Sequence, residues 1–523
     1  MQPPRTAAAL ILAVVMPLMG GSASAQPPTT PPATDALARL DRVIADRTDA
    51  SGVPGFAVAV VSGDRVVHVR GFGDADASGR PVTGDTPFVT GSSGKAFTAL
   101  ALMQLVDAGK VDLDAPVRRY VPELRLADRA DADRILVRHV VQHTSGLRAG
   151  AIGPVLASAA DGSALDAIAE IRDEKPVTRP GQTWDYANVN YVLAGLIIER
   201  ASGERFAQYM QRRVFGPLGM RRTFTSLAEG RAAGLASGAR YWFGVTRWHG
   251  PTFRRGVQAA GYYISTANDL ARFLRAFLNQ GVVDGRRVIS QRGLQSLMTP
   301  GPDAHLGPWA DGASARYAMG WFAGGPWRER VYFHPGNTPD SSSMIAFMPE
   351  RGWAVASMTN ISNELPVPGN PAVPDRLARN VIDVLLDEPI TGVSAHRFYA
   401  IFDLVALGIL ALLAWSLTRA AFAVRRATPT PHRIRSAAAV PIRALAGILI
   451  AFAPGLASAG WASSSLWSPD LTLTLVVFGS LLLITAMLRA AWLVRSKRHV
   501  QLPALDLRAE PLRLAPERER AEQ

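Results

Sequence analysis

Residues 56–70 have the sequence FAVAVVSGDRVVHVR. Two valine-rich runs flank the turn Ser62-Gly63-Asp64, and this pattern predicts a β-hairpin with strands at Phe56–Val61 and Arg65–Arg70. A helix is expected just before the hairpin, over Asp35–Arg47, because apolar side chains recur there at helical spacing.

Strand-like runs return only far downstream. They are Tyr317–Phe322, Val331–Phe333, Ser343–Met348 and Trp353–Thr359, and a helix over Asp375–Leu386 closes the series. The stretch between is rich in helical patterns, beginning with a helix from about Ser93 to Ala108. Strands near both ends with helices between them predict an α+β fold for residues 35–390. Its antiparallel sheet is built from both ends of the chain, and a mainly helical subdomain is inserted.

Composition excludes several classes of protein. The chain has 523 residues, 48% of them hydrophobic, and its 46 glycines and 37 prolines exclude a collagen-like or wholly disordered chain. The absence of cysteine excludes a disulfide framework, a thiolate nucleophile and an iron–sulfur cluster. Of the net charge of +13, only +4 falls in residues 26–394 and +8 falls in residues 395–523, so nucleic-acid binding is not predicted.

The N-terminus has the pattern of an export signal. Arg5 precedes an apolar run, Ala7–Leu18, and small residues follow at Ala23-Ser24-Ala25. This arrangement predicts a signal peptide over residues 1–25, and the short apolar centre argues against an uncleaved anchor helix. Residues 26–34, QPPTTPPAT, are then expected to form a Pro/Thr linker.

Three apolar runs follow the body, at Phe398–Thr418, Ala444–Pro469 and Leu471–Leu488. Each is close to the ~20 residues that a helix needs to cross hydrocarbon, so we expect a three-helix membrane domain at 398–495. Buried core helices are the alternative, but arginines bracket the three runs.

The basic residues predict the orientation of these helices. They gather after the first run and after the third, which places those segments in the cytoplasm. The body would then lie on the periplasmic side of a bacterial inner membrane, as the signal peptide also requires, and residues 496–523 would form a disordered cytoplasmic tail.

One group of residues could carry chemistry. The chain contains neither HExxH nor GxSxG, which excludes a zincin and a nucleophile elbow. Ser92-Ser93-Gly94-Lys95, however, places a hydroxyl and an amine one turn apart at the start of a helix. Lys95 could take the proton of Ser92 if desolvation and neighbouring cations lowered its pKa.

Two further motifs follow in order. Tyr186 and Asn188 offer a phenol and an amide on one loop, and a nearby lysine would lower the pKa of the phenol. His334-Pro335-Gly336 follows a strand-like run, with glycine where a backbone could approach a ligand closely. Singly, such motifs are structural far more often than catalytic.

Together these motifs resemble the penicillin-recognising serine hydrolases, on the branch of class C β-lactamases, D-Ala-D-Ala carboxypeptidases, D-aminopeptidases and esterases. The resemblance spans about residues 36–388. It is supported by Gly91–Leu100 (GSSGKAFTAL), His143–Leu147 (HTSGL), Pro180–Asn188, Ala260–Leu270 (AGYYISTANDL) and Tyr317–Trp321 (YAMGW). It implies a serine β-lactamase-like fold and needs no metal or cofactor.

The resemblance also implies roles for individual residues. Ser92 would form an acyl-enzyme, Lys95 would help to remove its proton, and Tyr186 would shuttle protons. Asn188 would orient the substrate amide, and the backbone N–H groups of Ser92 and Asn337 would hold the oxyanion. His334 and Gly336 would line the side of the site that faces a substrate carboxylate. His143 would belong to a structural turn, and Ser145 is the least favoured alternative nucleophile.

Departures from the family pattern bear on the substrate. The third motif has His334 in place of lysine and Pro335 in place of a residue that often carries a hydroxyl, while Asp340 stands where relatives often have glycine. We therefore expect a D-amino-acid peptide or small ester as substrate, with weak or absent β-lactamase activity. The alternative is a sensor of β-lactams or cell-wall fragments that is acylated with little turnover. A transporter with an appended domain has little support, and the sequence does not identify a protein partner.

Overall fold

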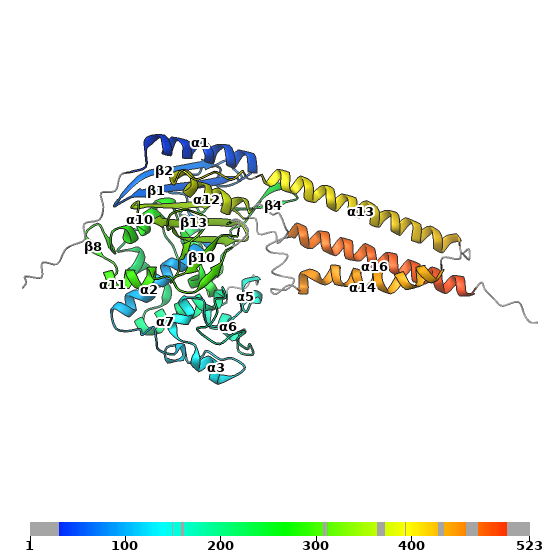
Figure 1. The fold of residues 1–523 in the computed structure, drawn as a ribbon, viewed down its shortest axis with the longest axis horizontal. Helices are drawn as coiled ribbons and strands as arrows, with labels where there is room; N and C mark the ends of the chain where they lie inside the picture. Colours follow the sequence, from blue (N-terminus) through cyan, green and yellow to red (C-terminus); the bar gives the residue numbers. More distant parts are fainter. Residues whose placement is uncertain are drawn as a thin grey trace, which may run out of the picture.

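The computed structural model describes residues 31–498 except 149, 158–161, 307–309, 311, 363–371, 393, 427–432 and 457–468. It contains a body of mixed helices and strands, from which three long helices extend side by side (Figure 1). The predicted signal peptide (1–25), most of the linker and nearly all of the tail lie outside the described residues.

An eight-stranded sheet forms the centre of the body, in the order β2-β1-β14-β13-β12-β11-β10-β9. All its pairings are antiparallel, and β1 joins the two ends of the chain by pairing Phe56 with Thr359 of β14. The bounds are β1 Gly55–Ser62, β2 Arg65–Gly73, β9 Asp303–His305, β10 Ser314–Tyr317, β11 Phe322–Gly324, β12 Tyr332–Thr338, β13 Ser341–Met348 and β14 Trp353–Thr359. The predicted α+β sheet, built from both chain ends, is confirmed.

Helices cover both faces of this sheet, which explains why Phe56–Val61 is apolar at every position. Ala57, Ala59 and Val61 pack into one core with α2 (Lys95–Asp107) and α10 (Ala267–Leu278). Phe56, Val58 and Val60 point the other way and pack with α1 (Thr34–Ser51) and α12 (Val373–Leu385). Because strand side chains alternate between faces, a central strand buried on both sides shows no polar alternation.

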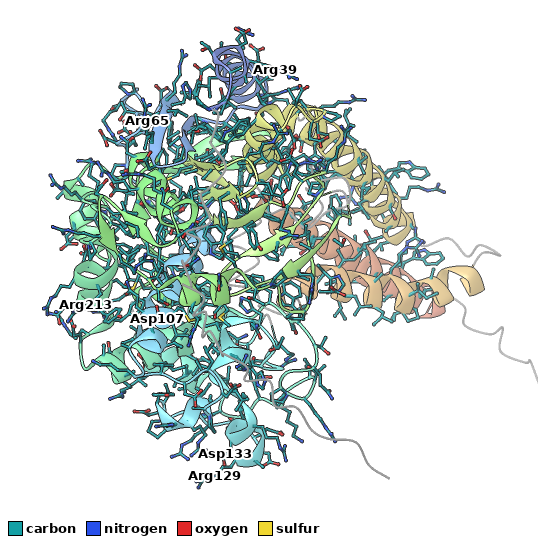
Figure 2. The ribbon with its side chains drawn as sticks, turned by 60° about the vertical axis from the view of Figure 1, so that its left-hand side comes forward. Arg39, Arg65, Asp107, Arg129, Asp133 and Arg213 are labelled. Carbon is teal, nitrogen blue, oxygen red and sulfur yellow. The ribbon has the colours of Figure 1, made fainter. Side chains whose placement is uncertain are left out.

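The helical subdomain lies between β2 and β9 in sequence. Its helices are α3 Arg129–Arg134, α4 Val137–Val141, α5 Gly153–Ala157, α6 Ala164–Ala169, α7 Asn188–Ser202, α8 Phe206–Tyr209, α9 Leu227–Ala232 and α11 Gln291–Met298, with short turns η1 Gly91–Gly94, η2 Val117–Arg119, η3 Met210–Phe215 and η4 Arg255–Ala260. Small sheets join β3 (Phe88–Val89) to β6 (Ile264–Ser265), β7 (Val282–Val283) to β8 (Arg286–Arg287), and β4 (Gly238–Trp242) to β5 (Val245–His249) and β15 (Ile361–Ser362). Charged side chains such as Arg39, Arg129 and Arg213 point outward around the body rather than gathering at one place (Figure 2).

One prediction for local structure was wrong. Tyr317–Phe322 is a turn and not one strand, because β10 ends at Tyr317, β11 begins at Phe322, and Gly320 between them has φ +80°. The helix expected from about Ser93 to Ala108 is present: the 3₁₀ turn η1 precedes it, and regular α-helix runs over Lys95–Asp107.

The C-terminal helices are α13 (Ala395–Arg426), α14 (Arg433–Leu456) and α16 (Pro469–Arg498). Among the described residues two stretches are long and apolar enough to cross a membrane, Ala395–Arg425 and Pro469–Val494. A third spanning helix is not confirmed, because the apolar part of α14 is only Ala439–Pro454, and much of the predicted second run lies outside the described residues.

Candidate active site

Ser92 and Lys95 lie at the junction of η1 and α2, beneath the sheet. Gly91 begins the turn with φ +58°, a conformation that favours glycine. Helix α2 is apolar on nearly all sides and almost wholly buried, so Lys95 is carried into the core with no exposed surface. Ser92, one turn earlier, stays partly exposed.

The Lys95 amine is surrounded by oxygen atoms, and within the described residues none of its hydrogen bonds goes to a carboxylate. Its Nζ lies 3.0 Å from Ser92 Oγ, 2.8 Å from Asn188 Oδ1 and 2.6 Å from the carbonyl oxygen of Ala260. Burial lowers the pKa of Lys95 well below its ordinary value. A neutral amine here can donate to Asn188 and Ala260 and accept the Ser92 proton. The sequence analysis also expected neighbouring cations to lower the pKa of Lys95, but they do not contribute to this shift, which burial causes.

Tyr186 and Asn188 reach the same point from the start of α7. The Tyr186 ring centre lies 4.8 Å from Lys95 Nζ, and the Tyr186 ring stacks on His143 with ring centres 4.3 Å apart. Asn188 is the first residue of α7, and its amide oxygen accepts from Lys95. The structure therefore brings together the first two predicted motifs.

The strand β12 forms the opposite wall of the site. A Cβ on Gly336 would lie 2.2 Å from the carbonyl oxygen of Thr90, and one on Gly91 would lie 2.5 Å from the backbone nitrogen of Asn337. The strand and the Ser92 turn thus touch through backbone. The sequence led us to expect a close approach of Gly336 to a ligand; the close neighbour that the structure shows is the turn itself. The Asn337 side chain turns away and donates to Asp375 at 3.3 Å; burial raises the pKa of Asp375 to about 6.

His334 is buried and neutral. Its Nδ1–H donates to the carbonyl oxygen of Pro335 at 2.6 Å, which leaves Nε2 to accept from the Tyr317 hydroxyl at 3.2 Å. Burial first, and then the nearby Lys95, lowers the pKa of His334 to about 3. The side chain that replaces the family's lysine therefore adds no positive charge, as expected from the sequence.

His143 supports the loop that carries Tyr186. Its φ is +56°, its carbonyl oxygen accepts from Asp185 N–H at 2.8 Å, and its Nδ1 accepts from Ala187 N–H at 3.2 Å. These bonds agree with a structural turn. Ser145 is fully buried, its Oγ accepts from Leu147 N–H, and it does not line the cavity described next.

A cavity of about 340 Å³ opens above Ser92. Its wall holds most of the predicted site residues together with a group that is mainly aromatic or apolar: Leu156, Trp184, Tyr262, His305 and Phe322. No arginine or lysine is among the described residues of this wall. The sequence analysis did not assign any of these five residues to the site. Trp184 and Tyr262 lie within the Pro180–Asn188 and Ala260–Leu270 motifs, whereas Leu156, His305 and Phe322 come from separate elements and belong to no quoted motif.

The role of Asp340 also becomes clear only from the structure. Its buried carboxylate accepts from the backbone N–H of Thr252 at 2.9 Å and from the Thr338 hydroxyl at 3.1 Å. It therefore joins the end of β12 to the segment between β5 and η4. Among the described residues, no group of three or more His, Asp or Glu side chains could hold a metal ion.

The chain is similar in sequence to known proteins. Protein flp of Staphylococcus aureus is 23% identical over 331 residues, covering 63% of this chain and 64% of that protein. Unguisins hydrolase ungD' of Aspergillus campestris is 28% identical over 335 residues, covering 61% and 60%. The chain thus spans less than two thirds of the length of either relative.

Among solved structures, the octameric penicillin-binding protein homologue from Pyrococcus abyssi is 26% identical, with a TM-score of 0.58 over 67% of this chain and 78% of that one. A model of the beta-lactamase family matches residues 40–377, which include the Ser92, Tyr186 and His334 motifs. The chain therefore belongs to the beta-lactamase family, within the penicillin-recognising serine hydrolases.

Proposed function

We propose that this protein is a serine hydrolase that cleaves a small amide or ester through an acyl group on Ser92. One observation carries the proposal: Lys95 Nζ is buried, lies 3.0 Å from Ser92 Oγ, and has no acidic hydrogen-bond partner in the part of the chain that the structure describes. Such an amine is held neutral and positioned to accept the hydroxyl proton. A lysine with a structural role would instead be paired with a carboxylate or extended into solvent.

The reaction proceeds in two steps. Lys95 takes the proton from Ser92 while Oγ attacks the substrate carbonyl, and the oxyanion is held by the backbone N–H groups of Ser92 and Asn337. Through Tyr186, beside the Lys95 amine, this proton then passes to the leaving group as its bond to the carbonyl carbon breaks, which leaves the acyl group on Ser92 and the amine neutral again. Water then attacks the acyl carbonyl, giving up its proton through Tyr186 and restoring the Ser92 hydroxyl.

The substrate class follows from the cavity wall. A neutral His334 and the absence of a hydroxyl at Pro335 leave nothing in the third motif that binds a free carboxylate strongly. The aromatic wall favours an apolar group beside the scissile bond. The preferred substrates are therefore D-amino-acid peptides, amides or small esters without a carboxylate at that position, with β-lactams hydrolysed weakly.

The enzyme is anchored in a bacterial inner membrane. Residues 1–25 direct export and are removed, the body at 35–390 lies on the periplasmic side, and the C-terminal tail is cytoplasmic. The two long apolar helices, α13 and α16, support this arrangement, and the apolar part of α14 is the third span.

Labelling and turnover by the full chain in detergent test the proposal. A fluorophosphonate probe should label wild-type protein and not Ser92→Ala, and an activated ester should be turned over many times per molecule. If Ser92 is acylated but the acyl group stays trapped, the chain is a sensor and not an enzyme. If Ser92→Ala matches wild type in both assays, the proposed nucleophile is wrong.

A further inference from the structure

The β4–β5 hairpin has an unusual surface. Of the six large hydrophobic side chains that are exposed in the described part of the body, three lie on this hairpin: Trp242, Val245 and Trp248, at 37%, 54% and 36% exposure. They include both tryptophans in that group of six. Single exposed apolar residues are ordinary, but three on one short hairpin form a patch that needs a partner.

The hairpin tip is in contact with the C-terminal helices. Phe243 lines an apolar cavity of about 380 Å³ together with Leu407 of α13 and Val477 of α16. A Cβ on Gly244 would lie 2.8 Å from the Cβ of Tyr399 on α13. In Figure 1, β4 accordingly lies at the base of α13. The exposed hairpin residues therefore adjoin the apolar surface of α13, where Ile401, Leu404 and Val405 are more than half exposed.

Two carboxylates indicate the depth of the tip. Asp403 of α13 lines the same cavity as Phe243, and Asp470 lies at the first turn of α16. Because a carboxylate is costly inside hydrocarbon, this level is the boundary between water and membrane and not the bilayer centre. Tryptophan is enriched at that boundary, and an exposed arginine such as Arg247 of β5 can reach lipid phosphates from it.

We propose that the β4–β5 hairpin is a membrane-interface element that places Trp242, Val245 and Trp248 in the headgroup region of the outer leaflet. The proposal rests on the membrane anchoring proposed above, and the partner is the bilayer that α13 and α16 cross. The hairpin fixes the body against the membrane, because the chain just after β5 is tied to the central sheet by the hydrogen bond from Thr252 N–H to Asp340. The next turn, η4, contains Ala260, whose carbonyl oxygen accepts a hydrogen bond from Lys95. The active site is thereby held in a fixed orientation above the lipid surface.

The absence of cysteine makes a site-specific test direct. Val245→Cys in the full chain is labelled with an environment-sensitive fluorophore and reconstituted into phosphatidylethanolamine/phosphatidylglycerol nanodiscs containing a lipid spin-labelled near its headgroup. Val177→Cys is the matched control, since Val177 is 53% exposed against 54% for Val245. Quenching by the spin-labelled lipid should be at least several-fold stronger at 245, and Trp248→Cys should give the same result as Val245→Cys.

A third variant separates this inference from the anchoring on which it rests. Leu412→Cys on α13, where Leu412 is 65% exposed, reports on the span itself through a lipid spin-labelled deep in its acyl chain. Quenching at 412 without quenching at 245 overturns the hairpin proposal and leaves the anchor intact. Absence of quenching at 412 overturns both the anchoring and the hairpin proposal. Protection of the 245 label from iodide without lipid quenching means that protein covers the patch, which also overturns the proposal.

Discussion

Replacing Gly336 with alanine tests whether the backbone contact between β12 and the Ser92 turn sets the catalytic geometry. The new Cβ would lie 2.2 Å from the carbonyl oxygen of Thr90 and 2.6 Å from the backbone nitrogen of Ser93. Neither atom belongs to a flexible side chain, so the strand must move. Restoring a tolerable contact of about 3.2 Å requires a displacement of about 1 Å, and the adjacent Asn337 N–H moves with the strand.

The expected loss is large because the oxyanion is held between two fixed donors. A misplacement of about 1 Å can reduce the rate on the order of 10²-fold, so kcat/KM for an activated ester should fall by about that factor in Gly336→Ala. Overpacking should also lower the free energy of unfolding by about 1–3 kcal/mol.

The matched control is Gly250→Ala. No atom lies within 4 Å of a Cβ placed on Gly250, and its φ is not in the left-handed region, so activity and stability should remain near those of wild type. The assay compares kcat/KM, fluorophosphonate labelling rate and urea unfolding for the three proteins. Activity of Gly336→Ala within about 3-fold of wild type, with an unchanged unfolding midpoint, would refute this reasoning.

Three further predictions concern titratable groups. Lys95 must be neutral to accept a proton, so kcat/KM should rise with pH through the pKa of Lys95, with a midpoint well below that of an ordinary lysine; a midpoint near 10.5 in a pH–rate profile would contradict the role of burial. Lys95→Met should abolish Ser92 acylation, at least about 10³-fold, while the urea midpoint stays equal or rises, because a buried amine is replaced by an apolar side chain of similar length. His334 has a folded pKa of about 3 against 6.5 when unfolded, so its protonation favours the unfolded state. The free energy of unfolding should therefore decrease as pH falls from 6.5 toward 3. At pH 5 this amounts to about 2 kcal/mol relative to pH 7, and His334→Gln should remove that part of the acid sensitivity in urea titrations; an identical pH dependence in both proteins would show that His334 titrates normally.

The parts of the fold that were predictable are those with a local pattern. The valine runs at 56–70 predicted the hairpin, and the Ser92–Lys95 spacing predicted a shared helical face. Tyr317–Phe322 misled because its aromatic and apolar composition suits a strand, while the left-handed turn at Gly320 breaks it. Composition alone does not distinguish a buried turn from a buried strand.

The cavity wall could not be predicted, for a different reason. Trp184, His305 and Phe322 meet only because the helical subdomain folds onto the free end of the sheet. Likewise, the desolvation of Lys95 depends on α7 and η4 closing over α2, which no single segment encodes. The sequence predicted which groups react, whereas their electrostatic setting required tertiary structure.

The pairing of β1 with β14 has a consequence for how the protein matures. Ser92, the proposed nucleophile, follows the first hairpin, but the wall that contains Asn337 is made about 245 residues later, and β1 stays without its β14 partner until Thr359 has been synthesised. Contacts this distant in sequence form late in folding. In the proposed topology, a chain still being translocated would therefore carry Ser92 and Lys95 without an assembled site. Competence for hydrolysis would then arise only as α13, which begins at Ala395, reaches the membrane.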